Sequence, residues 1–214
     1  MINKLRSWHN NTIGEKVVKA LQQNRFEAVY FENSQEAVDY ILKQIPEGAK
    51  IGIGGSSTLR EIGLIDILQQ KGFLLSDHNQ PDLTAEEKKQ RRYKQLTSDI
   101  FLTGSNAITL KGELVNRDGI GNRVAAMIFG PQKVIVVAGI NKVVRNLEEA
   151  EQRIKNVAAP MNSKRHEIQN PCAKTGQCAD CQTGTRICNV TTIIHRCPPL
   201  TKIQVVIIGE TLGF

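Results

Sequence analysis

The segment Lys50–Gln70, KIGIGGSSTLREIGLIDILQQ, changes its hydrophobic pattern partway along. Its first four residues form a short apolar run of the kind found in a buried strand. Glycines and serines at 54–57 interrupt that run, and beyond Thr58 apolar residues recur at helical spacing as far as Gln70. A strand that enters a helix through a glycine-rich loop is half of a βαβ unit, so the segment predicts a parallel sheet.

The rest of the chain continues this alternation of strands and helices. Further helices are expected at 12–24, 34–44, 84–97 and 146–157, the second with Ser34 as its N-cap. Strands are expected at 28–31, 50–53, 72–76, 99–103, 107–110, 113–116, 133–138 and 203–208. The run KVIVVA at 133–138 is apolar throughout, which indicates a strand buried on both faces. We therefore predict an α/β fold with a Rossmann-like, mostly parallel sheet and helices on both faces.

Length and charge restrict the organisation and the partners. At 214 residues and 40% hydrophobic content, the chain can bury one substantial core, so we expect a single domain over 1–214. No segment is apolar enough to be a membrane span or a signal peptide, which favours a cytoplasmic protein. The net charge is +7, but the basic stretch EEKKQRRYKQ at 86–95 alternates acids and bases at helical spacing. No nucleic-acid-binding motif accompanies it, so no nucleic-acid partner is expected.

The only cysteines lie in the last fifth of the chain, with the spacing C-x5-C-x2-C-x6-C-x8-C. Thiolates suit zinc and iron–sulfur centres, and a C-x2-C step directs two sulfurs to one centre. A structural zinc site usually has two such steps, so the single one favours a 4Fe-4S cluster, with zinc as the alternative. The expected ligands are Cys172, Cys178, Cys181 and Cys188, with Cys197 as a substitute. Free or redox-active thiols are a further reading, and the odd number argues against disulfides.

These cysteines occupy a predicted insertion, or flap, at about 165–200, before the last strand. The stretch 151–202 around it contains eight Lys or Arg residues and three acidic ones. These positive charges would offset the negative charge of a thiolate-bound centre or bind an acidic partner. A solvated basic loop explains the same composition equally well.

Two loops on this scaffold are candidates for ligand binding. The first provides Gly54, Gly55, Ser56 and Thr58, whose backbone N–H groups and hydroxyls suit an anion at the start of a helix. It matches neither the dinucleotide fingerprint nor the P-loop, and a tight structural turn is the alternative.

The second loop, 103–131, is rich in glycine, amides and charges at the carboxyl end of a predicted strand, where parallel sheets bind ligands. Its candidate binding residues are Gly104, Asn106, Asn116, Asp118, Gly119, Asn122 and Arg123. Arg123 is suited to a carboxylate or phosphate, Asp118 to a hydroxyl or amine, and Asn106 to a carbonyl. The sequence NRDG at 116–119 also predicts a turn.

Several stretches together resemble one known family. They are IGIGGSSTLREIGL, TGSNAITLKGELVNRDGIGNRVAA, VVAGINKVV, AAPMNSKRH and the C-x5-C-x2-C run. They are similar to the lactate-utilisation protein C family, whose members consist of a LUD domain. The resemblance implies the fold shared by ribose-5-phosphate isomerase, glucosamine-6-phosphate deaminase and CoA transferases. It also implies a role in the oxidation of L-lactate to pyruvate, beside iron–sulfur partner subunits and with a small carboxylate as ligand.

Catalytic residues are not assigned by this resemblance. The similar stretch of methylthioribose-1-phosphate isomerases has a catalytic aspartate where this chain has Asn106, and an amide does not transfer protons at neutral pH. CoA-transferase chemistry needs a carboxylate nucleophile, for which Glu113 is the nearest candidate and Asp118 the second. The histidines at 9, 78, 166 and 195 are scattered, which predicts surface or packing roles.

Two hypotheses of different classes follow. In the first, the chain is a non-catalytic or accessory subunit of an iron–sulfur-dependent system for L-lactate oxidation, which binds a small carboxylate or docks an electron-transfer partner. In the second, it is a stand-alone enzyme of the isomerase and CoA-transferase superfold, acting on a small phosphorylated or carboxylated metabolite, with a structural zinc. Either hypothesis is compatible with a homo-oligomer.

Overall fold

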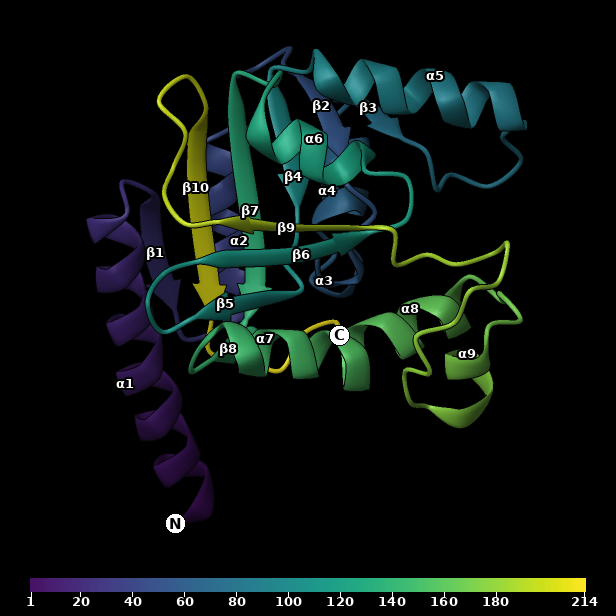
Figure 1. Cartoon of the computed structure of the whole chain (residues 1–214). Helices are drawn as coiled ribbons and strands as arrows, with labels where there is room; N and C mark the ends of the chain where they lie inside the picture. Colours follow the sequence, from purple (N-terminus) through teal and green to yellow (C-terminus); the bar gives the residue numbers. More distant parts are fainter.

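A computed structural model describes residues 1–214 and contains two β-sheets (Figure 1). The larger sheet has six strands, in the order β1 (Glu27–Phe31), β10 (Lys202–Ile208), β7 (Lys133–Gly139), β4 (Ile100–Thr103), β2 (Lys50–Ile53) and β3 (Leu74–Asp77). Every pair of neighbours in it is parallel. The smaller sheet has the order β8 (Val143–Val144), β5 (Ala107–Thr109), β6 (Leu114–Asp118) and β9 (Val190–Ile194). The predicted α/β class and mostly parallel central sheet are confirmed.

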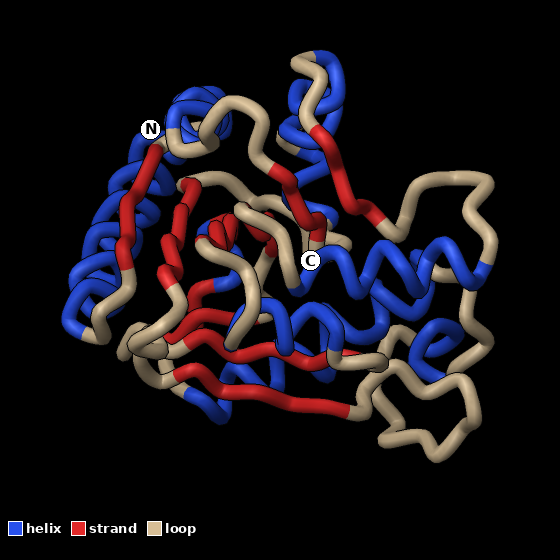
Figure 2. Tube along the Cα trace, turned by 90° about the horizontal axis from the view of Figure 1, so that it is seen from above, coloured by secondary structure: helices blue, strands red, loops and turns tan.

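Both faces of the larger sheet are covered, and Figure 2 shows helices on opposite sides of the strands. Ile135 and Val137 of β7 pack in one core cluster, with α2 (Ser34–Lys43), α3 (Ser57–Glu61) and α4 (Leu64–Gln70). Val134 and Val136 face the other way and pack with α1 (Ile2–Gln23), α6 (Asn122–Ile128) and strands of the smaller sheet. Burial on both faces explains why β7 reads as an uninterrupted apolar run.

The remaining helices lie around the sheet edges. They are α5 (Ala85–Leu96), the 3₁₀ turn η1 (Ile140–Lys142), α7 (Leu147–Arg153), the π-helical turn η2 (Ile154–Ala158), α8 (Ala159–Arg165) and α9 (Pro171–Thr175). The cysteine-rich stretch consists of α9 and a loop that runs to β9, and Figure 1 shows α9 at the lower right, away from the larger sheet. No helix is both long enough and apolar enough to span a bilayer.

Several predicted boundaries are wrong for local reasons. The helix expected to continue to Gln70 breaks at Gly63, which has φ of 70° and begins α4 anew. The N-cap of α2 is Asn33 rather than Ser34, because the Asn33 side chain accepts the backbone N–H of Glu36. The first half of α1 was not predicted, since its residues are largely exposed and carry no buried periodicity.

The predicted turn NRDG at 116–119 is also wrong. Residues 116–118 instead complete β6, which stays extended through Asp118 because it pairs with the antiparallel strand β9. Strand β9, and the helix α6 that follows β6, were not expected from the sequence. Because of this pairing, the chain is still extended at Asp118, which lines the cavity described below.

The arrangement of β2 and β4 opens a crevice at that edge. The two strands are parallel neighbours, so their carboxyl ends lie side by side. The chain leaves β2 through α3, which packs on one face, and leaves β4 through β5, which packs on the other. Connections that diverge to opposite faces leave a gap between neighbouring strands, which is the usual ligand position in open parallel sheets.

Candidate functional site

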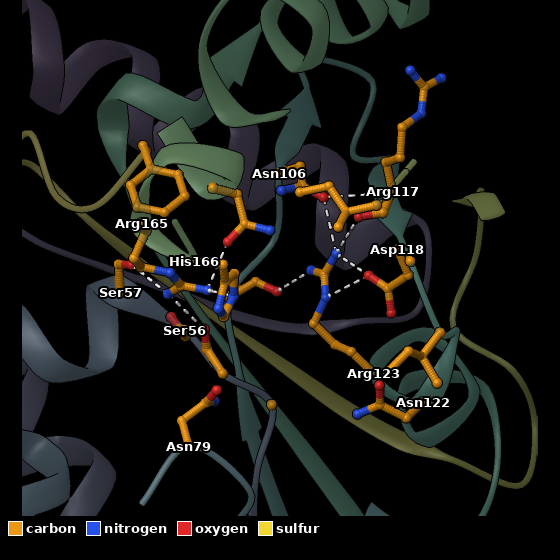
Figure 3. Close-up of a pocket in the computed structure, with 18 of the residues that line it drawn as sticks. Ser56, Ser57, Asn79, Asn106, Arg117, Asp118, Asn122, Arg123, Arg165 and His166 are labelled. Carbon is orange, nitrogen blue, oxygen red and sulfur yellow. Dashed lines mark hydrogen bonds and ion pairs between the residues drawn. The ribbon is translucent and has the colours of Figure 1, made fainter. Parts of the chain in front are cut away.

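A cavity of about 320 Å³ lies at the carboxyl ends of β2 and β4 (Figure 3). Its walls come from the loops 54–57 and 104–106, the end of β6 with the start of α6, and the end of α8. His78 and Asn79, which follow β3, and Phe214 at the end of the chain complete it. The volume suits a small metabolite rather than a dinucleotide.

The glycines of the two loops allow this close approach. A side chain at Gly54 would place its Cβ 2.6 Å from Oγ1 of Thr103, and one at Gly104 would lie 2.9 Å from Oγ of Ser56. Gly55 has φ of 73°, a conformation that favours glycine. The backbone N–H groups of Gly55 and Ser56 donate to no acceptor of the chain, so they remain available to a ligand.

The charges around the cavity are mostly positive. Five cationic side chains line it: Arg92, Arg117, Arg123, Lys142 and Arg165. Asp118 is the single carboxylate side chain in the lining. A small cavity with this balance favours an anionic ligand.

Arg123 is occupied entirely by the protein itself. Its Nε and Nη2 donate to Oδ1 of Asp118 at 2.9 and 2.6 Å, while Nη1 donates to Oδ1 of Asn116 at 2.6 Å. Further bonds reach Oδ1 of Asn106 and the carbonyl of Gly104 (Figure 3). A guanidinium has five N–H donors, so Arg123 has none left for a ligand.

Arg117 is also paired. Its Nη2 lies 2.7 Å from Oε2 of Glu151, and its Nε donates to Oγ1 of Thr191. In Figure 3 its guanidinium points away from Arg123 and Asp118. Arg117 and Arg123 therefore hold the walls together rather than face a ligand.

Arg165 has no carboxylate partner. Its Nη1 donates to Oγ of Ser57 at 2.8 Å and to the carbonyl of Gly55 at 3.1 Å, and its guanidinium lies over the ring of Phe214. Its Nη2 donates to Oδ1 of Asn162 at 2.6 Å and lies 3.0 Å from Nε2 of His166, so Nε is the donor without a partner. Desolvation, followed by repulsion from Arg60 and Arg123, lowers the pKa of Arg165. These contacts hold the cation at the rim of the cavity while its charge stays uncompensated.

Arg92 forms no hydrogen bond to the chain, and its Nε is buried without a partner. Burial lowers the pKa of Arg92. The pKa of His78 is lowered to about 4. Burial is the larger cause, and repulsion from the positive charge of Arg92 is the second. At neutral pH His78 is therefore uncharged, and Arg92 is a cation with an unused donor.

Lys142, at the end of η1, is the most deeply buried of the cations. It is 3% exposed, and its Nζ donates to Oγ1 of Thr58 at 2.7 Å. No carboxylate lies within ion-pair distance. Burial, with the charges of Arg153 and Arg123, lowers the pKa of Lys142 to about 7. The amine is thus close to half deprotonated at neutral pH.

A family model described as the LUD domain matches residues 14–208. The chain is a member of the LUD domain family. The resemblance drawn from the sequence motifs is therefore confirmed. No curated protein matches the sequence of this LUD domain.

Solved structures give a fold comparison. A DUF162 family protein from Deinococcus radiodurans is 13% identical, with a TM-score of 0.55, and the match covers 93% of this LUD domain and 98% of that chain. A ribose 5 phosphate isomerase A from Neisseria gonorrhoeae is 16% identical, with a TM-score of 0.37, over 53% of this chain and 54% of its own. At 13% identity the first match shows a shared fold and nothing finer.

The cavity brings together most of the binding residues that the sequence suggested. Those lining it are Gly54, Gly55, Ser56, Gly104, Asn106, Asp118, Gly119, Asn122 and Arg123. Thr58 and Asn116 are fully buried behind the wall, where they hold Lys142 and Arg123. Glu113 lies outside the cavity, at the other end of β6, and accepts from Oγ1 of Thr109.

Sequence reasoning missed the residues that make this LUD domain cationic where a ligand would sit. These are Arg92, Lys142 and Arg165, and the lining residues His78, Asn79 and His166 were missed as well. Arg92 belongs to the basic stretch that was read as a solvated helix, and His78 and His166 were expected to have surface or packing roles. Lys142, in the short turn that follows the buried strand β7, was the one signal in the sequence that pointed here.

The cysteines separate into two groups. Arg186 donates to the carbonyls of Cys181 and Cys188 at 2.6 and 3.2 Å. Burial raises the pKa of the Cys188 thiol, and Cys178 and Cys172 are near enough to add to that rise.

Cys197 lies apart from these four residues. Strand β9, roughly 15 Å long, lies between Cys188 and Cys197 in the chain, and the sulfur of Cys197 lies 3.1 Å from the carbonyl of Thr201. All five cysteines are free, and no three histidine, cysteine or acidic side chains are close enough to hold a metal ion. Cys172 and Cys178 thus lie near Cys188, and Cys181 shares the contact with Arg186.

Proposed function

We propose that this LUD domain binds a small carboxylate in the cavity at β2 and β4, as a subunit of a system that oxidises L-lactate to pyruvate beside iron–sulfur partner subunits. One observation carries the proposal: Arg92, Lys142 and Arg165 surround a cavity of metabolite size, and none has a carboxylate partner in the chain. Unpaired cations that are partly desolvated gain most from an anionic ligand. The LUD family supplies the link to lactate utilisation.

In this proposal the chain holds and orients the ligand. Arg165, fixed by Ser57, Gly55 and Asn162, pairs with the carboxylate at the rim through its remaining donor, Nε. The free N–H groups of Gly55 and Ser56 lie on the same loop and donate to further oxygen atoms of the ligand. The electrons of lactate oxidation leave through the partner subunits, so the binding domain needs no oxidant of its own.

We also propose that Cys172, Cys178, Cys181 and Cys188 bind an iron–sulfur cluster, with zinc as the alternative. The loop that carries them contains only the short helix α9, so few backbone hydrogen bonds oppose a rearrangement that brings the four sulfurs together. Such a centre would supply electron transfer if it is iron–sulfur, and rigidity if it is zinc. The distance of Cys197 from the rest argues for the first four residues as the set.

The alternative function is a stand-alone enzyme acting on a small phosphorylated metabolite. The same unpaired cations and loop N–H groups would also suit a phosphate, which favours this second candidate. Glu113 is remote from the cavity, so a carboxylate nucleophile would have to be Asp118. Asp118, however, is already held by Arg123 and by the backbone N–H of Val124.

Calorimetric titration distinguishes the two functions. We would titrate the protein with L-lactate, pyruvate and ribose 5-phosphate at low ionic strength, and repeat each titration with Arg165→Gln. The proposal expects binding of lactate or pyruvate that weakens about tenfold in the variant, corresponding to about 1.4 kcal/mol. The matched control is Arg145→Gln, an exposed arginine outside the cavity. Binding of the sugar phosphate alone would replace our proposal with the alternative.

A further inference from the structure

Lys142 is an unusual residue for a core position. A lysine that is 3% exposed normally has a carboxylate partner, but this one has a single hydrogen bond, to the hydroxyl of Thr58. An apolar side chain would avoid the cost of burying a charge at this position. Lys142 also belongs to the residues that line the cavity.

Lys142 and Arg165 both bind hydroxyls at the start of α3. Lys142 binds the hydroxyl of Thr58, and Arg165 binds the hydroxyl of Ser57, the preceding residue. Both anchors therefore belong to the first turn of α3, which borders the cavity. Gly213 leaves room for the amine, since a Cβ there would lie 3.2 Å from Nζ.

The surroundings of this amine lower its pKa and so favour its neutral form. Burial is the largest effect on its pKa, followed by repulsion from Arg153 of α7 and Arg123 of α6, and Glu61 of α3 acts in the opposite direction. With a pKa of about 7, a large fraction of Lys142 carries a free electron pair at neutral pH. An exposed lysine has a pKa of about 10.4, so almost none of its amine is in the neutral form at pH 7.

We infer that Lys142 forms an imine with the carbonyl group of a 2-oxo acid bound in the cavity. The inference rests on the proposed carboxylate function and names its substrate class. The amine nitrogen attacks the carbonyl carbon, a C–N bond forms, and the carbonyl oxygen departs as water with the two amine protons. No oxidant or reductant takes part. L-lactate has a hydroxyl in place of the carbonyl, so it binds without reacting.

Borohydride trapping tests the inference. Wild-type protein is incubated with pyruvate at pH 7, reduced with sodium borohydride, and analysed by intact mass and peptide mapping. We expect one adduct per chain, located on Lys142, and none when L-lactate replaces pyruvate. The yield should increase as pH rises through about 7. Lys142→Met and Lys142→Arg should both lose the adduct, whereas the exposed control Lys4→Met should retain it.

Calorimetry separates failure of the imine from failure of the carboxylate function. Lys142→Arg keeps the positive charge, so it should still bind pyruvate in a titration. If pyruvate binds to the wild type but no adduct forms, or the adducts spread over exposed lysines, the imine is overturned and the carboxylate function stands. If neither pyruvate nor L-lactate binds, both proposals are overturned. Mapping on the wild type needs no variant, so a misfolded Lys142→Met protein would not block the test.

Discussion

Arg123 and Asp118 form an ion pair in which Nη2 lies 2.6 Å from Oδ1, and the two side chains are only 14% and 8% exposed. The pair joins the start of α6 to the end of β6, and the same guanidinium reaches the carbonyl of Gly104 after β4. It therefore connects the smaller sheet to the edge of the larger one, beside the cavity.

Arg123→Ala should mainly destabilise the protein. Removing one partner of a buried pair costs about 3 to 5 kcal/mol, because Asp118 would be left as an uncompensated charge. Urea unfolding measures the change. The control Arg145→Ala removes an exposed pair with Glu149 and should cost no more than about 1 kcal/mol. If Arg123→Ala leaves stability unchanged but weakens ligand binding, Arg123 binds the anion directly, as the sequence predicted.

Arg92→Met should reduce affinity for the anionic ligand about tenfold, or about 1.4 kcal/mol, without loss of stability. The substitution removes a buried donor that has no partner, so folding loses no hydrogen bond. Arg91→Met, on the preceding position of α5, is the matched control, because Arg91 donates to the carbonyl of Leu75 and does not line the cavity. Equal effects of the two variants on affinity would exclude Arg92 from the site.

The pKa of His78 gives an independent readout of the same cation. Repulsion from Arg92 helps to lower the pKa of His78 to about 4. Arg92→Met should therefore raise this pKa, and Arg91→Met should leave it unchanged, in an NMR titration of the imidazole. A bound anion should also raise it. An unchanged value in Arg92→Met would mean that burial alone sets the pKa.

His78 also makes stability depend on pH. Its pKa in the folded protein, about 4, is lower than the unfolded value of about 6.5, so the unfolded chain binds the proton more readily. The free energy of unfolding should consequently fall as pH decreases from about 6.5 toward 4, by at most about 1.4 kcal/mol per pH unit from this residue. His78→Gln should flatten that part of the profile in urea unfolding. An identical slope in wild type and variant would contradict the expectation.

The proposed cluster predicts a specific pattern among cysteine variants. Protein prepared without oxygen should contain iron and acid-labile sulfide, and replacing both Cys178 and Cys181 with serine should remove them. Cys197→Ser is the control and should retain the metal, because its sulfur lies near the carbonyl of Thr201, away from the other four. One zinc per chain without sulfide would favour the structural alternative. Metal retained by the double variant would exclude this ligand set.

Local sequence patterns were sufficient for much of the scaffold. The run at 133–138 became β7 because burial on both faces demands continuous apolar residues, and Lys50–Ile53 became β2. The helix break at Gly63 and the extension of β6 through Asp118 were not predictable in the same way. The first depends on where the chain must turn to pack α4, and the second on pairing with β9, which lies more than 70 residues later.

The sequence by itself determined the α/β class, the LUD family and the two loops after β2 and β4, because these depend on periodicity and on contiguous motifs. Only the tertiary structure decided which charges those loops face. It paired Arg123 with Asp118 inside the protein and left Arg92, Lys142 and Arg165 without carboxylates. These three residues come from α5, η1 and α8, and only long-range packing brings them to one cavity. An ion pair is set by distance and burial in three dimensions, which no local pattern records.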